Sequence, residues 1–324
     1  MSTLRRLIAL LALAGLLVTA FAPAAVARSS KKPEGWATAS TGDLRTALHC
    51  QSGALRPHAT PVLLVSGTAV DGSELWTNGF QDALLAAGHK SCYLDLPDHA
   101  LGDMQVSAEY VADAIRRMSR GSTRHVAVYG WSQGAVLPRL ALTIWPDLRD
   151  EVTDVVALAG FQHGSVGGFP CGSFPCKPAM WQRSLGSNLL RALNSQGDET
   201  PGPTSWTTVR TANEDTALPV DTATLDGATN ILIQDACPGR QTSHIQVPFD
   251  SVSFAALLDA LANEGPADPA RLPSSVCDGP VAPGLDPAQV SADIAALLPT
   301  IIGRFFGQEV PAVPAEPPVR PFPR

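Results

Sequence analysis

The sequence lacks any excess of basic residues. Its 324 residues include 23 lysines and arginines against 30 aspartates and glutamates, which gives a formal net charge of −7. A nucleic-acid partner requires clustered positive charge, so we expect no binding of nucleic acid. The chain also lacks an internal repeat of fixed period. With 45% hydrophobic residues, it has enough apolar material for the core of one large domain or two small ones.

Long apolar runs are missing beyond the first 27 residues, so we expect no transmembrane segment in the mature chain. The N-terminal stretch places two arginines before an apolar segment and ends in the small-residue pattern Ala-Val-Ala. This arrangement predicts a signal peptide at 1–27 and therefore a secreted protein. An uncleaved membrane anchor is the alternative, which Pro23 and the cleavage pattern disfavour.

Clusters of cysteine and histidine are also missing. Only six cysteines occur, and the closest pair, Cys171 and Cys176, has a single histidine nearby, His163. A structural zinc site gathers four such ligands, so we expect no metal. In an exported protein the six cysteines are instead candidates for disulfides, although sequence alone does not define their connectivity.

Short apolar runs alternate with helical patterns through most of the chain. Strands alternating with helices predict an α/β fold, with a mostly parallel central sheet and helices on both faces. The strand patterns occur at 61–66, 91–96, 124–130, 152–159, 206–211 and 230–234, and the helical patterns at 76–87, 107–120, 133–145, 181–194, 251–263 and 287–304.

The two ends of this region differ from it in composition. Residues 28–39 begin with the polar stretch RSSKKPEG and are expected to form a flexible segment before the folded domain at 40–309. The tail at 310–324 reads VPAVPAEPPVRPFPR. Proline at this density excludes a helix or a central strand, so we expect the tail to be extended or disordered.

One pentapeptide, Gly130-Trp131-Ser132-Gln133-Gly134, joins a predicted strand to a predicted helix. In an α/β fold, a Gly-x-Ser-x-Gly turn at this point holds its serine above the carboxyl edge of the sheet, as a nucleophile elbow. The glycines are needed because strand and helix crowd each other there. The pattern by itself also fits an ordinary turn, but its flanking elements are those of an elbow, and no second copy occurs.

A serine hydroxyl needs a base that removes its proton and a carboxylate that orients the base. In the α/β-hydrolase fold the acid and then the histidine follow the serine along the chain. Only His163 and His244 follow Ser132, and His163 comes too early to leave room for an acid-bearing loop, so His244 is the predicted base. Two neighbouring candidates for the acid, Glu214 and Asp215, come just after the second-last predicted strand.

Acyl transfer also needs preorganised donors for its oxyanion. One donor is predicted at the amide of Gln133, directly after the serine. The other is predicted in the loop after the first strand, where Thr68 offers an amide and a hydroxyl. Because these groups and the three side chains supply the proton transfer and the charge stabilisation, we expect no cofactor.

Several motifs, taken in order, resemble the lipase B-like family of secreted α/β-hydrolases, which are serine lipases and esterases. The resemblance implies the α/β-hydrolase fold for the catalytic domain at 40–309. It runs from about Leu44 to Gly303 and is carried by PVLLVSGT at 61–68, TNGFQDALLAAGHKSCYLDLP at 77–97, the Trp-Ser-Gln-Gly core of the pentapeptide and a Leu-Leu-Pro late in the last predicted helix.

By position, the resemblance implies that Ser132 is the nucleophile, His244 the base, and Thr68 with Gln133 the oxyanion hole. Ungapped counting places the family's catalytic aspartate on Glu214. This departure leaves the choice of acid open, since a shift of one position would recruit Asp215 instead.

Four residues are candidates for the substrate pocket. The resemblance implies that Trp131 forms the floor of a small pocket that limits which alcohol groups fit, with simple packing beside the elbow as the alternative. Leu297, Leu298 and Ile301, in the last predicted helix, would line the entrance, and core packing explains them equally well.

The same resemblance implies disulfides Cys50–Cys92 and Cys237–Cys277. Cys171 and Cys176 lie where the family carries a small lid element, and we predict a local disulfide between them. The loop at 163–178, with Phe169 and Phe174, then forms either a stapled cap over the acyl site or a surface loop whose aromatic residues pack beneath it.

The expected function is hydrolysis of carboxylic esters, lipid esters in particular, by a secreted enzyme that forms an acyl-enzyme. The expected partners are an ester or lipid substrate and, transiently, a lipid interface. Cleavage of polyesters, or acyl transfer to an acceptor other than water, would use the same residues. A non-catalytic binding protein of this fold is a further alternative, which the presence of Ser132, His244 and a nearby acid disfavours.

Overall fold

Seven strands form one sheet in the order β1-β3-β2-β4-β5-β6-β7. The first strand is antiparallel to β3, and all other neighbours are parallel, so the mostly parallel α/β fold is confirmed. The strands are β1 (Leu48–Cys50), β2 (Val62–Val65), β3 (Ser91–Leu94), β4 (Val126–Trp131), β5 (Val152–Leu158), β6 (Ser205–Arg210) and β7 (Thr229–Leu232).

The computed structural model describes residues 35–56, 60–122, 125–167, 171 and 175–323. The predicted signal peptide at 1–27 lies outside these residues, as do Phe169 and Phe174 of the predicted cap. Within the described ranges, no helix has both the length and the apolar character needed to cross a bilayer.

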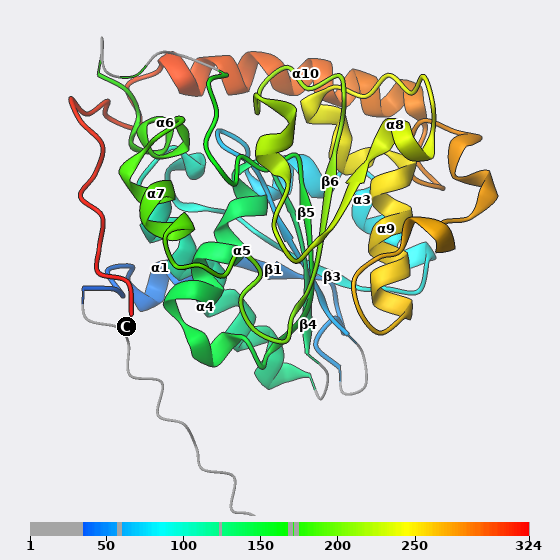
Figure 1. Cartoon of the computed structure of the whole chain (residues 1–324), viewed down its shortest axis with the longest axis horizontal. Helices are drawn as coiled ribbons and strands as arrows, with labels where there is room; N and C mark the ends of the chain where they lie inside the picture. Colours follow the sequence, from blue (N-terminus) through cyan, green and yellow to red (C-terminus); the bar gives the residue numbers. More distant parts are fainter. Residues whose placement is uncertain (1–34, 57–59, 123–124, 168–170, 172–174, 324) are drawn as a thin grey trace, which may run out of the picture. The chain divides into compact units, whose positions relative to one another are not determined.

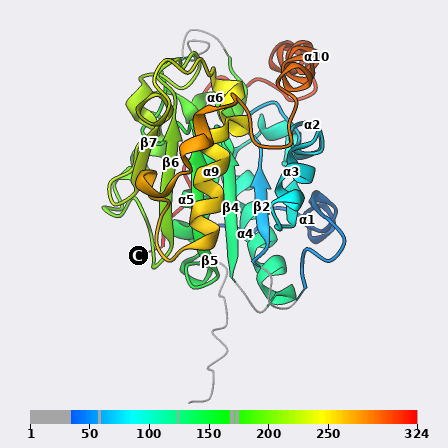
Figure 2. The same cartoon turned by 90° about the vertical axis from the view of Figure 1, so that its right-hand side faces the viewer.

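Helices cover both faces of the sheet (Figure 1; Figure 2). They are α1 (Thr41–Ala47), α2 (Gly72–Trp76), α3 (Phe80–Ala86), α4 (Met104–Gly121), α5 (Gln133–Ile144), α6 (Pro178–Arg183), α7 (Asn188–Asn194), α8 (Ile233–Ala236), α9 (Ser251–Ala262) and α10 (Pro287–Phe306). Short 3₁₀ helices are η1 (Pro97–Ala100), η2 (Pro146–Leu148), η3 (Val220–Ala223), η4 (His244–Phe249), η5 (Pro269–Arg271) and η6 (Ser274–Cys277).

Two of the predicted helices differ from the observed ones. The pattern at 181–194 becomes two helices, α6 and α7, whereas the pattern at 76–87 becomes α3, which begins only at Phe80, and α2 was not predicted apart from its last residue. A glycine in the left-handed region lies before α3 and before α7, Gly79 with φ 91° and Gly186 with φ 77°. Such a backbone cannot continue a right-handed helix, so each helix begins after its glycine.

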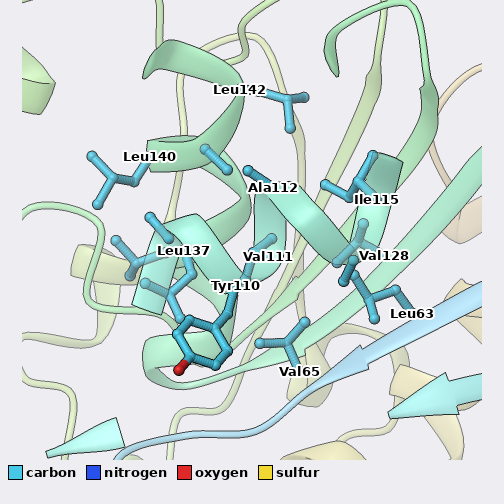
Figure 3. Close-up of a cluster of buried hydrophobic side chains, with 14 of the residues drawn as sticks. Leu63, Val65, Tyr110, Val111, Ala112, Ile115, Val128, Leu137, Leu140 and Leu142 are labelled. Carbon is cyan, nitrogen blue, oxygen red and sulfur yellow. The ribbon is translucent and has the colours of Figure 1, made fainter. Parts of the chain in front are cut away.

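Successive side chains of the central strands point to opposite faces of the sheet, and each face has its own hydrophobic core. On β2, Leu63 and Val65 pack with α4 and α5, whereas Val62 and Leu64 face the opposite cluster. Figure 3 shows the first cluster, in which the β2 side chains meet Val128 of β4 and apolar residues of both helices. Because the sheet is covered on both sides, its central strand β2 is a continuous apolar run, VLLV, with all four residues buried.

The N-terminal segment is packed where the structure describes it. Trp36 is only 5% exposed, and its ring lies 5.3 Å from Trp145 and 6.5 Å from Phe322 in edge-on contacts. The prediction of a flexible segment at 28–39 is therefore wrong for residues 35–39, because a buried tryptophan ties them to the domain. Residues 28–34 lie outside the described ranges.

The proline-rich tail was predicted to be extended or disordered. Over residues 310–323 it is extended and packed against the domain (Figure 1). Proline lacks an N–H yet keeps its carbonyl, and the tail carbonyls accept hydrogen bonds from the body. Trp181 donates to Val313 and Trp36 donates to Pro321. Val313 also exchanges two backbone hydrogen bonds with Cys176.

Asp154, near the amino end of β5, is a buried acid in the sheet. It is 7% exposed and lines a cavity of about 380 Å³. Burial raises its pKa from 3.8 to about 6, because the charged form loses hydration. Ionisation therefore favours the unfolded chain, and this residue's contribution to stability is lost as the pH rises from about 4 to about 6.

The variant Asp154→Asn should raise the free energy of unfolding at pH 8 by about 2 kcal/mol and change it little at pH 4. Denaturant titrations at the two pH values measure this difference. Asp226→Asn, at an exposed position, serves as the control and should have no such pH-dependent effect. Equal stability of wild type and Asp154→Asn at pH 8 would show that the buried charge carries no cost.

Candidate active site

Ser132 lies between β4 and α5, at the carboxyl edge of the sheet. Its backbone has φ 57° and ψ −118°, which is a strained conformation for a residue with a side chain. The hydrogen bond from its amide to the Leu158 carbonyl, 2.8 Å long, holds the turn against β5. The sequence pattern thus forms the sharp turn expected of a nucleophile elbow.

The two glycines of the pentapeptide are required by close backbone contacts. A Cβ atom on Gly130 would lie 2.0 Å from the Gly134 carbonyl oxygen. A Cβ atom on Gly134 would lie 2.3 Å from the carbonyl oxygen of Val65 on the neighbouring strand. Both distances are far below van der Waals contact, so any larger residue would force the strand and the helix apart.

His244 begins η4 and lies between the serine and an acid. Its Nε2 atom is 3.0 Å from Ser132 Oγ, and its Nδ1 atom is 2.8 Å from Glu214 Oε1. The side chains of His244 and Glu214 are only 6% and 3% exposed. Folding therefore brings three residues separated by 82 and 30 positions into one buried hydrogen-bonded chain of the kind found in serine hydrolases.

The turn after β6 determines which of the two candidate carboxylates reaches the histidine. Glu214 Oε1 accepts hydrogen bonds from the amides of Asp215, Thr216 and Ala217, at 3.1, 2.8 and 2.9 Å. Burial alone would raise the pKa of Glu214, but its hydrogen bond with His244, the charge of that ring and these amides leave it below the ordinary value.

Asp215, the alternative acid, points elsewhere. It is exposed, and its carboxylate accepts a hydrogen bond from the Thr216 hydroxyl rather than contacting the imidazole. The physical reason is the turn itself, which folds the Glu214 side chain back over its own amides and leaves the next residue on the outer side.

His163, the other histidine that follows the serine, lies outside this group. Its Nε2 atom is 3.1 Å from the Thr224 carbonyl oxygen, and its Nδ1 atom is 3.7 Å from Glu199. These contacts hold the loop after β5 against the segments that precede β6 and β7.

Thr68 and Gln133 meet beside the serine. The Thr68 hydroxyl donates to Gln133 Oε1 at 2.8 Å, so the loop after β2 is joined to the first turn of α5. As the first residue of α5, Gln133 has an amide without an acceptor inside the helix. The helix dipole adds partial positive charge at this point, which favours a developing oxyanion.

Three of the residues predicted for the pocket, Trp131, Leu297 and Ile301, lie in or against one core cluster. Leu298, which was also predicted at the entrance, is 43% exposed and lies on the outer side of α10. Trp131 is 3% exposed, its ring centroid is 5.3 Å from that of His244, and its Nε1–H donates to the His244 carbonyl at 2.9 Å. Leu297 and Ile301, on α10, are half-buried against the core cluster that contains Trp131. Ile301 also packs in a small cluster with Ala69, the residue after Thr68.

The six cysteines form three disulfides, Cys50–Cys92, Cys171–Cys176 and Cys237–Cys277. The last of these connects the segment before His244 to η6. Closing a loop of 40 residues in this way stabilises the fold by roughly 2–4 kcal/mol in the chain-entropy account.

One buried cation near the acid was not anticipated from the sequence. Arg183, at the end of α6, is 5% exposed and donates to the carbonyl of Thr216 at 3.0 Å, beside a second donor, the Ser165 hydroxyl. Burial lowers the pKa of Arg183, and the charge of Glu214 opposes that effect. An arginine within an amphipathic helix normally indicates the solvent face, so no sequence signal pointed to this role.

No group of three or more His, Cys, Asp or Glu side chains is arranged to hold a metal ion in the part of the chain that the structure describes. The reactive groups that the structure brings together at the site are the Ser132 hydroxyl, the His244 imidazole and the Glu214 carboxylate.

Comparisons with known proteins agree with this geometry. No protein-family model matches the chain. It is 28% identical to lipase B of Pseudozyma antarctica over 292 residues, which cover 87% of this chain and 84% of that protein. The crystal structure of Aspergillus fumigatus lipase B superposes with a TM-score of 0.79 at 28% identity, over 89% of this chain and 73% of that one.

A more distant structure shares the fold alone. The mature form of a Bacillus licheniformis lipase superposes with a TM-score of 0.50 at 17% identity, over 63% of this chain and 92% of that one. The chain is thus lipase B-like in sequence and structure and is an α/β-hydrolase in fold.

Proposed function

We propose that this protein is a serine hydrolase that cleaves carboxylic esters, lipid esters in particular, through an acyl-enzyme. The observation that carries the proposal is the buried chain of contacts from Glu214 through His244 to Ser132. The similarity to two proteins named lipase B supports the substrate class.

In the first half of the reaction, His244 Nε2 takes the proton of Ser132 Oγ as the oxygen attacks the ester carbonyl carbon. The carbonyl oxygen becomes an oxyanion, which the Gln133 amide and Thr68 stabilise. The imidazolium then donates its proton to the leaving alcohol oxygen, and the C–O bond breaks to leave an acyl-serine.

In the second half, His244 removes a proton from water, which attacks the acyl-serine carbonyl carbon. The second oxyanion collapses, Ser132 Oγ leaves and recovers a proton from the imidazolium, and the carboxylic acid departs. Glu214 stays ionised throughout, because its amide contacts and the adjacent imidazole favour the charged form.

The proposed substrate pocket lies between Trp131 and α10. We assign Trp131 to its floor, because a buried ring whose N–H is bonded to the His244 backbone cannot rotate away. We assign Leu297 and Ile301 to its wall, which makes the pocket apolar and suits acyl or alkyl groups.

We further propose that the protein is secreted. The signal-peptide pattern at 1–27 and the three disulfides support export, since disulfides persist in oxidising compartments.

The direct test of the catalytic proposal is labelling with a fluorophosphonate, a neutral reagent that phosphonylates an activated serine. Wild-type protein should be labelled at Ser132, and Ser132→Ala should be neither labelled nor active on p-nitrophenyl esters. Absence of labelling in folded, fully oxidised wild type would contradict the proposal. The rates on p-nitrophenyl esters of increasing length, beside emulsified triglyceride, then separate a lipase from a short-chain esterase.

A lipid interface as a transient partner is favoured by one face of α10. Leu298, Ile302 and Phe306 are spaced four residues apart and are 43%, 55% and 63% exposed. They form an apolar stripe on the outer side of the helix whose inner side carries Leu297 and Ile301. Exposed apolar side chains in a continuous row are typical of a surface that contacts a partner or a membrane.

Replacing Leu298, Ile302 and Phe306 together by serine should lower the rate on emulsified triglyceride about 10-fold, because the interface loses about 1.4 kcal/mol or more of apolar contact. The rate on soluble p-nitrophenyl butyrate should change less than about 2-fold, because the catalytic group is untouched. Equal losses on both substrates would show that the stripe acts on catalysis and not on interface binding.

A further inference from the structure

A cluster of charged side chains joins α10 to the loop that carries Thr68. The cluster consists of Asp71, Glu74, His99 and Arg304, which come from three separate parts of the chain. Arg304 lies in the last turn of α10 and is 14% exposed. None of the steps proposed above uses it.

The contacts of Arg304 converge on this loop. One guanidinium nitrogen donates to the Ala69 carbonyl at 3.0 Å and to Glu74 Oε2 at 2.6 Å. The other donates to Asp71 Oδ2 at 3.2 Å and to Glu74 Oε1 at 3.0 Å. Asp71 and Glu74 form the capping box of α2, and the guanidinium thus binds both of its carboxylates.

The pKa of Glu74 reflects its contact with the guanidinium. Burial alone would raise the pKa of Glu74, but the hydrogen bonds from Arg304 and from the Asp71 amide, with the arginine's charge, leave it below its ordinary value. The ion pair between Arg304 and Glu74 is partly buried and bidentate, so it is stronger than an ion pair that is exposed to solvent.

Ala69 is the residue on which the cluster acts most directly. Its φ is 66°, a left-handed conformation that is strained for a residue with a side chain. Its N–H donates to the His99 carbonyl at 2.8 Å, while its own carbonyl accepts from Arg304. Both polar groups of the strained residue are therefore held from outside the loop.

The His99 side of this arrangement is also fixed. Asp98, His99 and Ala100 have φ values of 56°, 51° and 58°, three left-handed residues in succession. His99 Nδ1 lies 2.9 Å from each Asp71 carboxylate oxygen, so the segment that binds the Ala69 amide is itself tied to the residue that binds Arg304.

We infer that Arg304 is a positioning residue of the oxyanion hole, which holds Thr68 in place through the carbonyl of Ala69. The inference rests on the proposed function, since it assigns Thr68 to that hole. Without the Arg304 contact, Ala69 relaxes toward an ordinary φ, and the preceding residue moves with it. Displacing a donor by about 1 Å costs up to about 100-fold in rate, because an oxyanion hole acts through preorganisation.

The same contact gives α10 a second role. The helix that bears Leu297 and Ile301 is anchored at its end to the loop that binds the oxyanion, so pocket wall and oxyanion hole keep a constant separation. An arginine provides this better than a lysine, because its planar fork reaches a carbonyl and two carboxylates at once.

The test compares variants that remove the carbonyl contact with variants that remove only an ion pair. Arg304→Met and the double variant Glu74→Gln/Arg304→Met both delete the bond to Ala69, and the double variant leaves fewer uncompensated carboxylates if the single one folds poorly. Arg116→Met is the matched control, since Arg116 forms a similar bidentate pair with Asp147.

Arg304→Met and the double variant should each lower kcat about 10- to 100-fold with KM changed less than about 3-fold, and should slow phosphonylation by the fluorophosphonate to the same degree. Glu74→Gln alone should lose much less, and Arg116→Met should keep the wild-type rates while losing a similar amount of thermal stability.

Two results would overturn the inference, provided that the wild-type protein reacts with the fluorophosphonate as the proposed function requires. One is a double variant with wild-type kcat and phosphonylation rate. The other is a Glu74→Gln variant that loses as much as Arg304→Met, which would assign the effect to the ion pair and not to the Ala69 carbonyl. Failure of wild type itself to react with the fluorophosphonate would instead contradict the proposed function.

Discussion

Glu214→Gln is expected to lower kcat by about 10³- to 10⁴-fold on p-nitrophenyl esters, with little change in KM. The glutamine oxygen can still accept from the amides of Thr216 and Ala217, so the turn after β6 should persist. An amide beside His244 Nδ1 cannot stabilise the imidazolium, and it favours the wrong tautomer whenever its NH₂ group faces the ring.

The matched control is the neighbouring Asp215→Asn, which removes an exposed carboxylate that makes no contact with His244. Its kcat should stay within about 3-fold of wild type, because solvent screens the charge of an exposed carboxylate that does not contact the imidazole. Steady-state kinetics on both variants, with thermal unfolding to confirm the fold, decide the question. If Asp215→Asn were the inactive variant, Asp215 and not Glu214 would be the acid that orients His244 in solution.

The second large effect concerns stability. Arg320→Met, in the C-terminal tail, should lower the free energy of unfolding by about 3 kcal/mol or more, because it leaves the buried carboxylate of Glu109 without its cation. Arg320 donates to Glu109 Oε1 at 2.6 Å and lies 5.3 Å above the ring of Trp36. The side chain of Glu109 is 3% exposed, and its pKa lies below the ordinary value.

That pKa results from opposing effects. Burial alone would raise the pKa of Glu109, while the hydrogen bonds from Ala39, Thr38 and Arg320 lower it further than burial raises it. Glu109→Gln/Arg320→Met should recover part of the stability lost in Arg320→Met, because an uncharged side chain is then buried.

Deleting residues 312–324 should destabilise the protein at least as much as Arg320→Met. The deletion also removes Glu316, whose carboxylate accepts from the amides of Asn188 and Leu189 at the start of α7. Thermal unfolding measures both effects, and Arg191→Met, at an exposed position, is the control. A truncated protein that melts within about 2 °C of wild type would show that the tail contributes nothing in solution.

The sequence predicted the sheet well because its central strands β2, β4 and β5 are almost completely buried. Six short runs rich in apolar and β-branched residues are enough to locate β2 to β7, and alternation with helices is enough to predict a mostly parallel sheet. The edge strand β1 has no such run: two of its three residues are exposed, and its pairing with β3 is visible only in three dimensions.

The candidate site divides in a similar way. Ser132 was identified by a local pattern, and His244 by its order in the chain, so both were accessible without a structure. Choosing between Glu214 and Asp215 was not, because the two differ by a single position and by the direction of one turn. The roles of Arg183 and Arg304 left no sequence signal at all, since each acts on backbone carbonyls far away in the chain.

By itself, the sequence determined the α/β class, the strand-turn-helix around Ser132 and the histidine available to it, because these follow from local periodicity, glycine at crowded turns and chain order. The tertiary structure decided which carboxylate meets the imidazole, that a proline-rich tail is bound along α6 and α7, and that α10 is tied to the Thr68 loop. Those features depend on contacts between residues tens to hundreds of positions apart, for which the chain carries no local periodicity.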